Sequence, residues 1–373
     1  MKQHHFLPVF LALIAFYIGQ HFYAARWLSK SFTLSPAAAS RLRLALLAAA
    51  FLSPFTMYLK RQFHNPVLEA LYAAGYAWMG VILIAAFIFL ASDLAGFLLR
   101  RAGQRAFPPQ LPPLTLAALA VILALALYGG LRTPDINEIP VAVKDLPAPL
   151  EGFRIAQISD MHVDSGWKLR QFNGIVERVN AARPDIVLIT GDLVDPGLTC
   201  REDLGEAALR LKSRLGTYGA LGNHEYYYGL DKAMDCYRDF GIKLLKNEAL
   251  DLKDIKLIGL GDIHTENISA GEVTALLEKN RDGKFTVIMT HQPLYYKEIA
   301  ETGDYLALSG HTHRGQIFPF SVFTRLAYKY FYGLYRIKGS AFYVTSGAGT
   351  WGPPLRWLAP AEIPVITLRR KTN

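Results

Sequence analysis

Residues able to bind metal ions recur at five places in the second half of the chain, each directly after a short apolar run. Carboxylate, imidazole and amide groups are ligands for hard and borderline cations. Any one of these motifs is common by chance. Together, however, they contain five of the ten histidines of the chain. The ordered set therefore predicts a shell of metal ligands. The motifs are Asp160-x-His162, Gly191-Asp192, Gly222-Asn223-His224-Glu225, His291 and Gly310-His311-Thr312-His313.

Two of the motifs place ligands two residues apart. In an extended chain, residues i and i+2 point to the same side, so we expect Asp160 and His162 to reach one cation from a single strand end. The same spacing separates His311 from His313. We therefore expect another strand end to deliver a pair of imidazoles.

The middle motifs offer a bridging group and a neutral one. Asp192 follows Gly191, whose missing side chain lets the backbone approach closely, and its two oxygens suit a bridge between ions about 3.5 to 4 Å apart. Asn223 offers a neutral amide oxygen. Adjacent residues in an extended turn point apart, so we expect Asn223 to face a metal and His224 to face the substrate.

Short apolar runs alternate with longer amphipathic stretches after residue 152, which predicts an α/β domain whose sheets are covered by helices. The predicted strands are residues 153–159, 185–190, 218–221, 255–260, 285–290, 305–309, 341–345 and 365–368. The predicted helices are residues 169–182, 200–215, 232–240 and 270–280.

The first third of the chain has a different composition. Residues 1–133 contain eleven Lys and Arg but only Glu69 and Asp93 as acids, whereas residues 134–373 contain 29 bases and 29 acids. The bases flank apolar segments at residues 6–23, 44–59, 70–92 and 114–131, and a helix needs about 20 apolar residues to span a bilayer. This pattern predicts an all-α transmembrane region of about four helices. It argues against nucleic acid as a partner and gives no support for a transporter, which would carry polar groups near the middle of the membrane.

Basic residues in short loops set the orientation, because Lys and Arg are retained on the cytoplasmic side. With four spans, seven bases follow the first and third segments, and four lie on the opposite side. This places both termini and the catalytic part outside the cytoplasm. The second segment is short, and if it is a re-entrant or interfacial helix the result reverses. The seven bases are Arg26, Lys30, Arg41, Arg43, Arg100, Arg101 and Arg105, and the four are Lys2, Lys60, Arg61 and Arg132.

Four prolines punctuate a segment without sustained periodicity, which predicts a linker at residues 134–152. The predicted organisation is a transmembrane region at residues 1–133, this linker, and an α/β domain at residues 153–373. Cys200 and Cys236 fit either one disulfide or two free thiols. The sequence carries no indication of the oligomeric state.

Residues 153–368 resemble the calcineurin-like metallophosphoesterase family, whose ordered signature is D-x-H, G-D, G-N-H-E, H and G-H-T-H. The tail, from GHTHRGQIFPF onward, is similar to the membrane-associated bacterial branch of that family and implies a protein of the bacterial inner membrane. The resemblance implies a four-layer α-β-β-α sandwich that binds two divalent metal ions. It implies that one ion is held by Asp160, His162, Asp192 and His313, and the other by Asp192, Asn223, His291 and His311. His224 would stabilise the transition state or protonate the leaving oxygen.

The implied activity is that of a metal-dependent phosphohydrolase. Two cations lower the pKa of a bridging water, so attack by a metal-bound hydroxide on phosphorus needs no covalent protein nucleophile. Mixed nitrogen and oxygen ligands suit Mn, Fe or Zn. Asp195 and Glu225 could orient ligand imidazoles, or they could be a solvated turn acid and a helix-start acid. Arg314 stands where this branch usually has Gly and could contact phosphate or be a solvated base, while His264 is expected to be structural.

The stretch from Ile317 to Arg336 interleaves aromatic and aliphatic side chains with bases, as suits the headgroup region of an anionic bilayer. We therefore expect the active site to face the membrane and to cleave a phosphate ester or diester of a lipid-linked or envelope molecule. The alternative is a strand and a helix of the domain core. Two other functions stay open. One is a hydrolase of a UDP-linked acylated sugar pyrophosphate, of the lipid A type of synthesis, which would need the cytoplasmic side. The other is a non-catalytic membrane scaffold.

Overall fold

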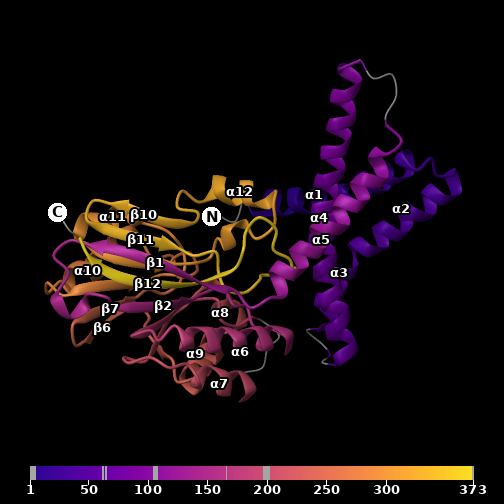
Figure 1. Cartoon of the computed structure of the whole chain (residues 1–373). Helices are drawn as coiled ribbons and strands as arrows, with labels where there is room; N and C mark the ends of the chain where they lie inside the picture. The colour runs from indigo at the N-terminus through magenta and orange to yellow at the C-terminus, as the bar shows by residue number, and fades with distance from the viewer. Residues whose placement is uncertain are drawn as a thin grey trace. The chain divides into compact units, whose positions relative to one another are not determined.

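The computed structural model in Figure 1 describes residues 6–60, 63, 65–103, 108–164, 166–195 and 202–371. The chain forms two compact units. The helical unit consists of Met1–Tyr128 and Gly352–Trp357, and the sheet unit consists of Gly129–Trp351 and Leu358–Asn373.

The helical unit is built from apolar helices with locally encoded starts. At the start of α4, Asn65 Oδ1 accepts a hydrogen bond from Leu68 N at 2.9 Å. Ser35 caps α2 in the same way. In both helices a proline occupies the first helical position, where no N–H partner is needed. The helices are α1 (Phe6–Ser31), α2 (Pro36–Ala50), α3 (Leu52–Lys60), α4 (Pro66–Arg101) and α5 (Leu111–Leu131).

Three stretches of the described residues are long and apolar enough to cross a membrane, namely Pro36–Leu59, Val67–Arg101 and Leu111–Leu131. They contain the second, third and fourth predicted segments. The second is longer than predicted, because the alanine-rich α2 already begins at Pro36 and α3 continues the apolar run. The first predicted segment lies in α1, and several side chains at its start fall outside the described residues. A fourth span therefore stays a prediction.

The bases used to predict the orientation lie mostly in helices. Arg26 and Lys30 belong to α1, and Arg41 and Arg43 lie within the candidate span Pro36–Leu59. Only residues 32–35 separate α1 from α2, so these four bases do not form a loop between two spans. Of the other counted bases, Lys2, Arg61 and Arg105 lie outside the described residues. The orientation accordingly stays a prediction.

Some buried polar groups inside the helical unit find partners, whereas Tyr17 Oη and Trp27 Nε1 have none among the described residues. Trp78 Nε1 donates a hydrogen bond to His21 Nε2 at 2.9 Å. The segment Gly352–Trp357 contributes to the same unit, since Arg356 N donates to the carbonyl oxygen of Ala126 at 2.8 Å. Pairing of this kind satisfies polar groups where no water is present.

Two six-stranded sheets form the sheet unit, in the orders β1-β12-β2-β3-β4-β5 and β10-β11-β9-β8-β7-β6. The first sheet contains β1 (Asp135–Val143), β2 (Arg154–Ile158), β3 (Ile186–Thr190), β4 (Thr217–Ala220), β5 (Lys243–Leu244) and β12 (Glu362–Arg370). The second contains β6 (Glu248–Leu252), β7 (Ile255–Gly259), β8 (Phe285–Met289), β9 (Tyr305–Ser309), β10 (Gly333–Ile337) and β11 (Ser340–Val344).

The helices of the sheet unit cover the outer faces of the sheets or follow strand ends (Figure 1). They are α6 (Gly166–Ala181), α7 (Glu202–Leu209), α8 (Asn223–Tyr228), α9 (Leu230–Asp239), α10 (Ala270–Lys279), α11 (Tyr296–Thr302) and α12 (Phe320–Ala327), with short 3-10 turns η2 (Ala148–Leu150) and η3 (His313–Gly315). Each predicted strand and helix overlaps an observed one, although residues 200 and 201 of the second predicted helix lie outside the described residues.

Three apolar cores separate four layers. One lies between the first sheet and the helices α6, α7 and α9, one lies between the two sheets, and one lies between the second sheet and the helices α10 and α11. This arrangement confirms the predicted four-layer α-β-β-α sandwich.

Alternation along the strands explains how both faces of a sheet become buried. Ile155 and Ile186 are paired neighbours on β2 and β3 and face the core between the sheets. The next pair, Ala156 and Val187, faces the helices. Because successive side chains point to opposite faces, strands of continuous apolar residues suit a sheet buried on both sides. Parallel strands also end at the same edge, where the polar motifs follow.

The predicted linker at residues 134–152 contains structure that belongs to the sheet unit. Residues 135–143 form β1, which pairs in parallel with β12 over nine residue pairs from Asp135↔Glu362 to Val143↔Arg370. Val141 and Leu150 are buried in the core between the sheets. The prolines suggested a linker instead of a strand. Pro140 is nevertheless tolerated in β1, because β1 lies at the edge of its sheet.

The structure describes one of the two cysteines. Cys236 is buried in α9 and is not a free thiol. Cys200 lies outside the described residues, and whether the two residues pair stays a prediction.

Replacing Leu150 tests whether the predicted linker is part of the core. Leu150 is 1% exposed, so Leu150→Ala should lower the free energy of unfolding by about 2 to 5 kcal/mol. The matched control is Leu209→Ala at the end of α7, where the side chain is 62% exposed and the change should stay within about 0.5 kcal/mol. Denaturant unfolding of the detergent-solubilised chain measures both, and equal effects would contradict the placement of Leu150.

Candidate metal centre

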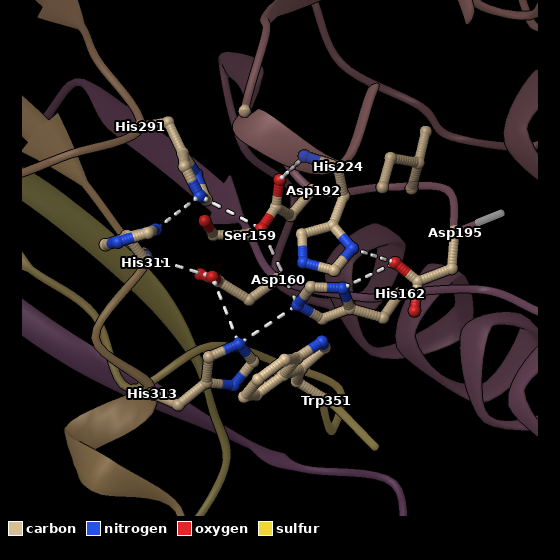
Figure 2. A network of polar contacts seen from close by, with 12 residues as sticks. Ser159, Asp160, His162, Asp192, Asp195, His224, His291, His311, His313 and Trp351 are labelled. Atoms are coloured by element: carbon tan, nitrogen blue, oxygen red, sulfur yellow. Dashed lines mark hydrogen bonds and ion pairs between the residues drawn. The ribbon is translucent and has the colours of Figure 1, made fainter. Parts of the chain in front are cut away.

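The predicted metal-binding side chains gather at one edge of the sheet unit, where strands of both sheets end (Figure 2). The first sheet supplies the residues that follow β2, β3 and β4, and the second sheet supplies those that follow β8 and β9. The first set is Asp160, His162, Asp192, Asn223 and His224, and the second is His291, His311 and His313.

One group of ligand atoms comes from Asp160, His162 and His313, which lie within 4.8 Å of one another. The two imidazole nitrogens His162 Nε2 and His313 Nε2 are 3.0 Å apart. His313 Nε2 also lies 3.4 Å from Asp160 Oδ1. Two imidazoles and a carboxylate thus aim at one small volume.

A second group consists of Asp192, His291 and His311, again within 4.8 Å of one another. Asp192 Oδ2 is 3.0 Å from His291 Nε2, and His291 Nε2 is 3.1 Å from His311 Nδ1. The same carboxylate oxygen lies 3.7 Å from His162 Nε2 of the first group. Asp192 therefore stands between the two groups, as its predicted bridging position requires.

The donor set fits divalent cations. Asp160 Oδ2 and Asn223 Oδ1 are buried and have no hydrogen-bond partner among the described residues, although an unsatisfied buried acceptor costs about 1 to 3 kcal/mol. Asn223 sits between two residues that contact Asp192, since His224 N donates to Asp192 Oδ1 at 2.9 Å and a Cβ on Gly222 would lie 2.2 Å from the same oxygen. Cations bound at the two groups would satisfy these oxygens together with the converging imidazole nitrogens.

Hydrogen bonds on the far side of two imidazoles fix which nitrogen faces the site. His291 Nδ1 donates to the carbonyl oxygen of Thr190 at 2.9 Å, and His162 Nδ1 donates to Asp195 Oδ1 at 2.9 Å. In each ring this leaves Nε2 as the nitrogen that faces Asp192. Such partners orient metal-binding histidines and raise their basicity.

Carboxylate and imidazole groups in this site shift one another's pKa values. Burial acts to raise the pKa of Asp192, but the neighbouring imidazoles, His291 foremost, lower it below its ordinary value. Burial acts to lower the pKa of His291, but the Asp192 carboxylate raises it to about 10. Burial and the charge on His291 lower the pKa of His311 to about 3. A cation at Nε2 of His291 would take the place of a proton, which couples metal binding to proton release.

The backbone at the ligands differs from the extended geometry expected from their spacing. Asp160 and His162 have φ values of 57° and 49°, and His311 and His313 have φ values of 70° and 49°. The expectation that these pairs share a direction because the chain is extended is therefore wrong, although both pairs reach the site. A left-handed conformation at a residue other than glycine costs of order 1 to 3 kcal/mol and persists where surrounding contacts enforce it. Here His311 N donates to Asp160 Oδ1 at 2.9 Å.

Gly310 allows the loop after β9 to approach the loop after β2 closely. A Cβ at Gly310 would lie 2.1 Å from Asp160 Oδ2. Any larger residue would displace that carboxylate, which explains why glycine precedes the His311 motif.

Asp195 accepts hydrogen bonds from two imidazoles, which supports the prediction that it orients ligand histidines. Its Oδ1 accepts hydrogen bonds from His162 Nδ1 and from His224 Nδ1, and the residue is 8% exposed. Burial acts to lower the pKa of His224, but the hydrogen bond to Asp195 raises it above its ordinary value. Asp195 thereby orients a candidate ligand of one group and the residue expected to meet the substrate.

Glu225 acts on the backbone, not on an imidazole. Its carboxylate is fully buried and accepts hydrogen bonds from the backbone N–H groups of Asp192 at 2.9 Å, Leu193 at 2.8 Å and Gly222 at 2.8 Å. Tyr237 Oη donates to the same carboxylate at 3.2 Å. The suggestion that Glu225 orients a ligand ring is therefore wrong. The alternative of a helix-start acid is confirmed, since Glu225 lies in the first turn of α8, and the residue also shapes the loop that carries Asp192.

Two aromatic residues at the site were not predicted as part of it. Tyr328 Oη lies 2.7 Å from His311 Nε2, on the opposite side of the ring from Nδ1. Trp351 is 53% exposed and its ring centroid lies 6.1 Å from that of His224, so it borders the site (Figure 2). No spacing rule links either residue to the motifs, and Tyr328 lies within the stretch from Ile317 to Arg336 that was expected to suit a membrane surface.

Arg314 and His264 stand apart from the two groups. The Arg314 guanidinium lies over the ring of Tyr332 at 4.3 Å from its centroid, and the residue is half-buried. His264 is exposed in the loop after β7. A phosphate contact by Arg314 stays a prediction, while the Tyr332 contact describes a base stacked on an aromatic ring.

Known proteins resemble the chain in this region and beyond it. The model of the calcineurin-like phosphoesterase family matches residues 153–315. An uncharacterized metallophosphoesterase of Helicobacter pylori is 40% identical over 66% of this chain and 67% of its own. One of Campylobacter jejuni is 36% identical over 69% of this chain and 70% of its own. A transmembrane protein with a metallophosphoesterase domain from Danio rerio is 31% identical over 78% of this chain and 71% of its own.

Asp195→Asn tests the orientation of the imidazoles independently of any reaction. Losing a carboxylate that orients a ligand commonly costs about 10- to 100-fold in metal affinity, so we expect such a loss for Mn or Zn in calorimetric titration. Asp145→Asn is the matched control, because its side chain is 87% exposed and its affinity should equal that of the original chain. Unchanged affinity in Asp195→Asn would show that the contact with His162 does not matter for binding.

Proposed function

The chain belongs to the calcineurin-like phosphoesterase family and is a metal-dependent phosphohydrolase, and we propose that it is anchored in a membrane and uses two divalent ions. The observation that carries the proposal is the position of Asp192 between two groups of ligand atoms. Three candidate spans in the same chain support the membrane anchor.

We propose that each of the two groups of ligand atoms binds one ion. The first ion would be held by Asp160, His162, Asp192 and His313, and the second by Asp192, Asn223, His291 and His311. The converging nitrogens and the unpaired oxygens of Asp160 and Asn223 support this assignment. Nitrogen and oxygen donors together favour Mn, Fe or Zn over Ca.

Bound ions at this site would lower the pKa of water, polarise the phosphoryl group and neutralise the charge that develops on its oxygens. The protein's own residues supply orientation and a proton. His224 is fixed through Nδ1 by Asp195, so Nε2 is the nitrogen available to protonate the leaving oxygen. Trp351, exposed beside His224, would border the substrate.

The substrate is proposed to be a phosphate ester or diester that is lipid-linked or derived from the cell envelope. The membrane anchor supports this class, and a bacterial inner membrane with the sheet unit outside the cytoplasm is the proposed location. The alternative of a UDP-linked acylated sugar has no observation in its favour. The non-catalytic alternative is opposed by a complete ligand set with His224 in place.

Hydrolysis of bis(p-nitrophenyl) phosphate with added Mn tests the activity. Asp192→Asn should abolish both hydrolysis and full metal occupancy, because it removes the ligand shared by the two groups. His224→Ala should keep metal occupancy while kcat falls by about 10²- to 10⁴-fold, the usual contribution of a general acid. A chelator should stop hydrolysis, and Mn should restore it.

The exposed Asp145→Asn serves as the control for both variants and should hydrolyse the diester at the original rate. If Asp192→Asn and His224→Ala also hydrolysed the diester at the original rate, the proposed enzymatic function would be wrong.

A reporter fused after residue 373 tests the orientation. We expect alkaline phosphatase activity in that fusion and no fluorescence of a cytoplasmic reporter, as four spans with the predicted excess of cytoplasmic bases would require. A fluorescent cytoplasmic fusion would reverse the proposed orientation.

A further inference from the structure

Helix α12 presents its apolar side to the outside. Its large apolar residues Phe320, Val322, Phe323 and Leu326 are 43%, 47%, 56% and 81% exposed. At 100° per residue they fall within one arc of the helix. None of the residues of α12 is buried, so the prediction that this part of the stretch belongs to the domain core is wrong.

The polar side of α12 packs against the rest of the domain. Gly315 of η3 packs against Ser321, since a Cβ at Gly315 would lie 2.2 Å from Ser321 Cα. Ser321 and Thr324 are half-buried, whereas the apolar positions are exposed. This pattern is the reverse of that of an ordinary surface helix, whose apolar stripe faces the core. The helix is thus built to hold an apolar surface away from the domain.

Unpaired positive charge accompanies this apolar surface. Arg325 and Lys329 are exposed, and neither forms an ion pair with a carboxylate in the part of the chain that the structure describes. Exposed apolar side chains flanked by bases match an anionic bilayer surface, where the chains enter the headgroup boundary and the bases meet lipid phosphates. A membrane is moreover within reach of this chain, because three of its helices can span one.

The helix is joined directly to the metal centre. Tyr328 is its C-terminal cap residue, and Tyr328 Oη lies 2.7 Å from His311 Nε2. Three residues further on, the carbonyl oxygen of Phe331 accepts a hydrogen bond from Thr312 Oγ1 at 2.7 Å. The segment that carries the exposed apolar surface therefore packs on the loop that carries His311.

We propose that α12 docks on an anionic lipid surface through Phe320, Phe323 and Leu326, and that this docking brings lipid phosphate esters to the metal centre. The substrate part rests on the proposed hydrolase function. The docking part does not, because it concerns only the contact between α12 and lipid.

Photocrosslinking in lipid nanodiscs tests the docking. The full chain is reconstituted in phosphatidylcholine with phosphatidylglycerol, with benzoylphenylalanine in place of Phe323 or, as a control, in place of Leu209, which is 62% exposed on α7. We expect lipid adducts by mass spectrometry at position 323 at about tenfold the yield at position 209, and a lower yield at position 323 in phosphatidylcholine alone.

Equal yields at the two positions, crosslinks from position 323 to a second copy of the chain, or equal yields with and without phosphatidylglycerol would overturn the proposal. The result does not depend on hydrolysis, so the docking and the proposed function can fail separately.

Two model diesters test the delivery of substrate. Phe323→Ser combined with Leu326→Ser should leave the hydrolysis of soluble methyl p-nitrophenyl phosphate unchanged, which also reports correct folding. Hydrolysis of hexadecyl p-nitrophenyl phosphate in vesicles should fall about tenfold, since two apolar side chains are removed from the lipid contact. Equal rates of the variant and the original chain on the hexadecyl ester, or equal losses on both esters, would overturn the role of α12. A chain that hydrolyses neither ester would instead overturn the proposed function.

Discussion

The buried carboxylate of Asp192 is the point on which both ligand groups depend. A carboxylate at 2% exposure is costly unless positive charge and hydrogen bonds surround it. His224 N donates to one of its oxygens, and imidazoles of both groups approach the other. Behind it, Glu225 binds the N–H groups of the loop. The position of the Asp192 side chain is thus fixed both by the imidazoles around its carboxylate and by the contacts of Glu225 with the backbone of its loop.

The site lies across the seam between the two sheets, and its geometry depends on how they pack. His291 of the second sheet donates to the Thr190 carbonyl oxygen of the first at 2.9 Å. Gln157 of the first donates to the Ser309 carbonyl oxygen of the second at 3.1 Å. These bonds run beside the core between the sheets, so a cavity made there would change the spacing of the ligands even though no ligand was replaced. Cations bound at both groups would in turn tie one sheet to the other.

The sequence predicted which carboxylate and imidazole side chains gather at the site, because each of them follows an apolar run that marks a strand. It could not predict the local backbone, since the left-handed conformations of Asp160 and His313 arise from contacts between loops that are distant in the chain. The role of Glu225 was missed for the same reason, because its partners belong to the Asp192 loop. Tyr328 lies 17 residues from His311, and no periodicity connects them. The strand at residues 135–143 was hidden because an edge strand with prolines has the composition of a linker.

The position of β12 has a consequence for the order in which the sheet unit is made. β12 lies between β1 and β2, so the strand translated first in this unit can join its sheet only after residues 362–370 have been synthesised. The contacts between β1 and β12 span more than 200 residues of chain, and non-local pairing of this kind slows folding. During that interval β1 and the adjoining edge of β2 present unpaired backbone groups, which are templates for wrong association. The first sheet therefore stays open between β1 and β2 until its last strand has been made.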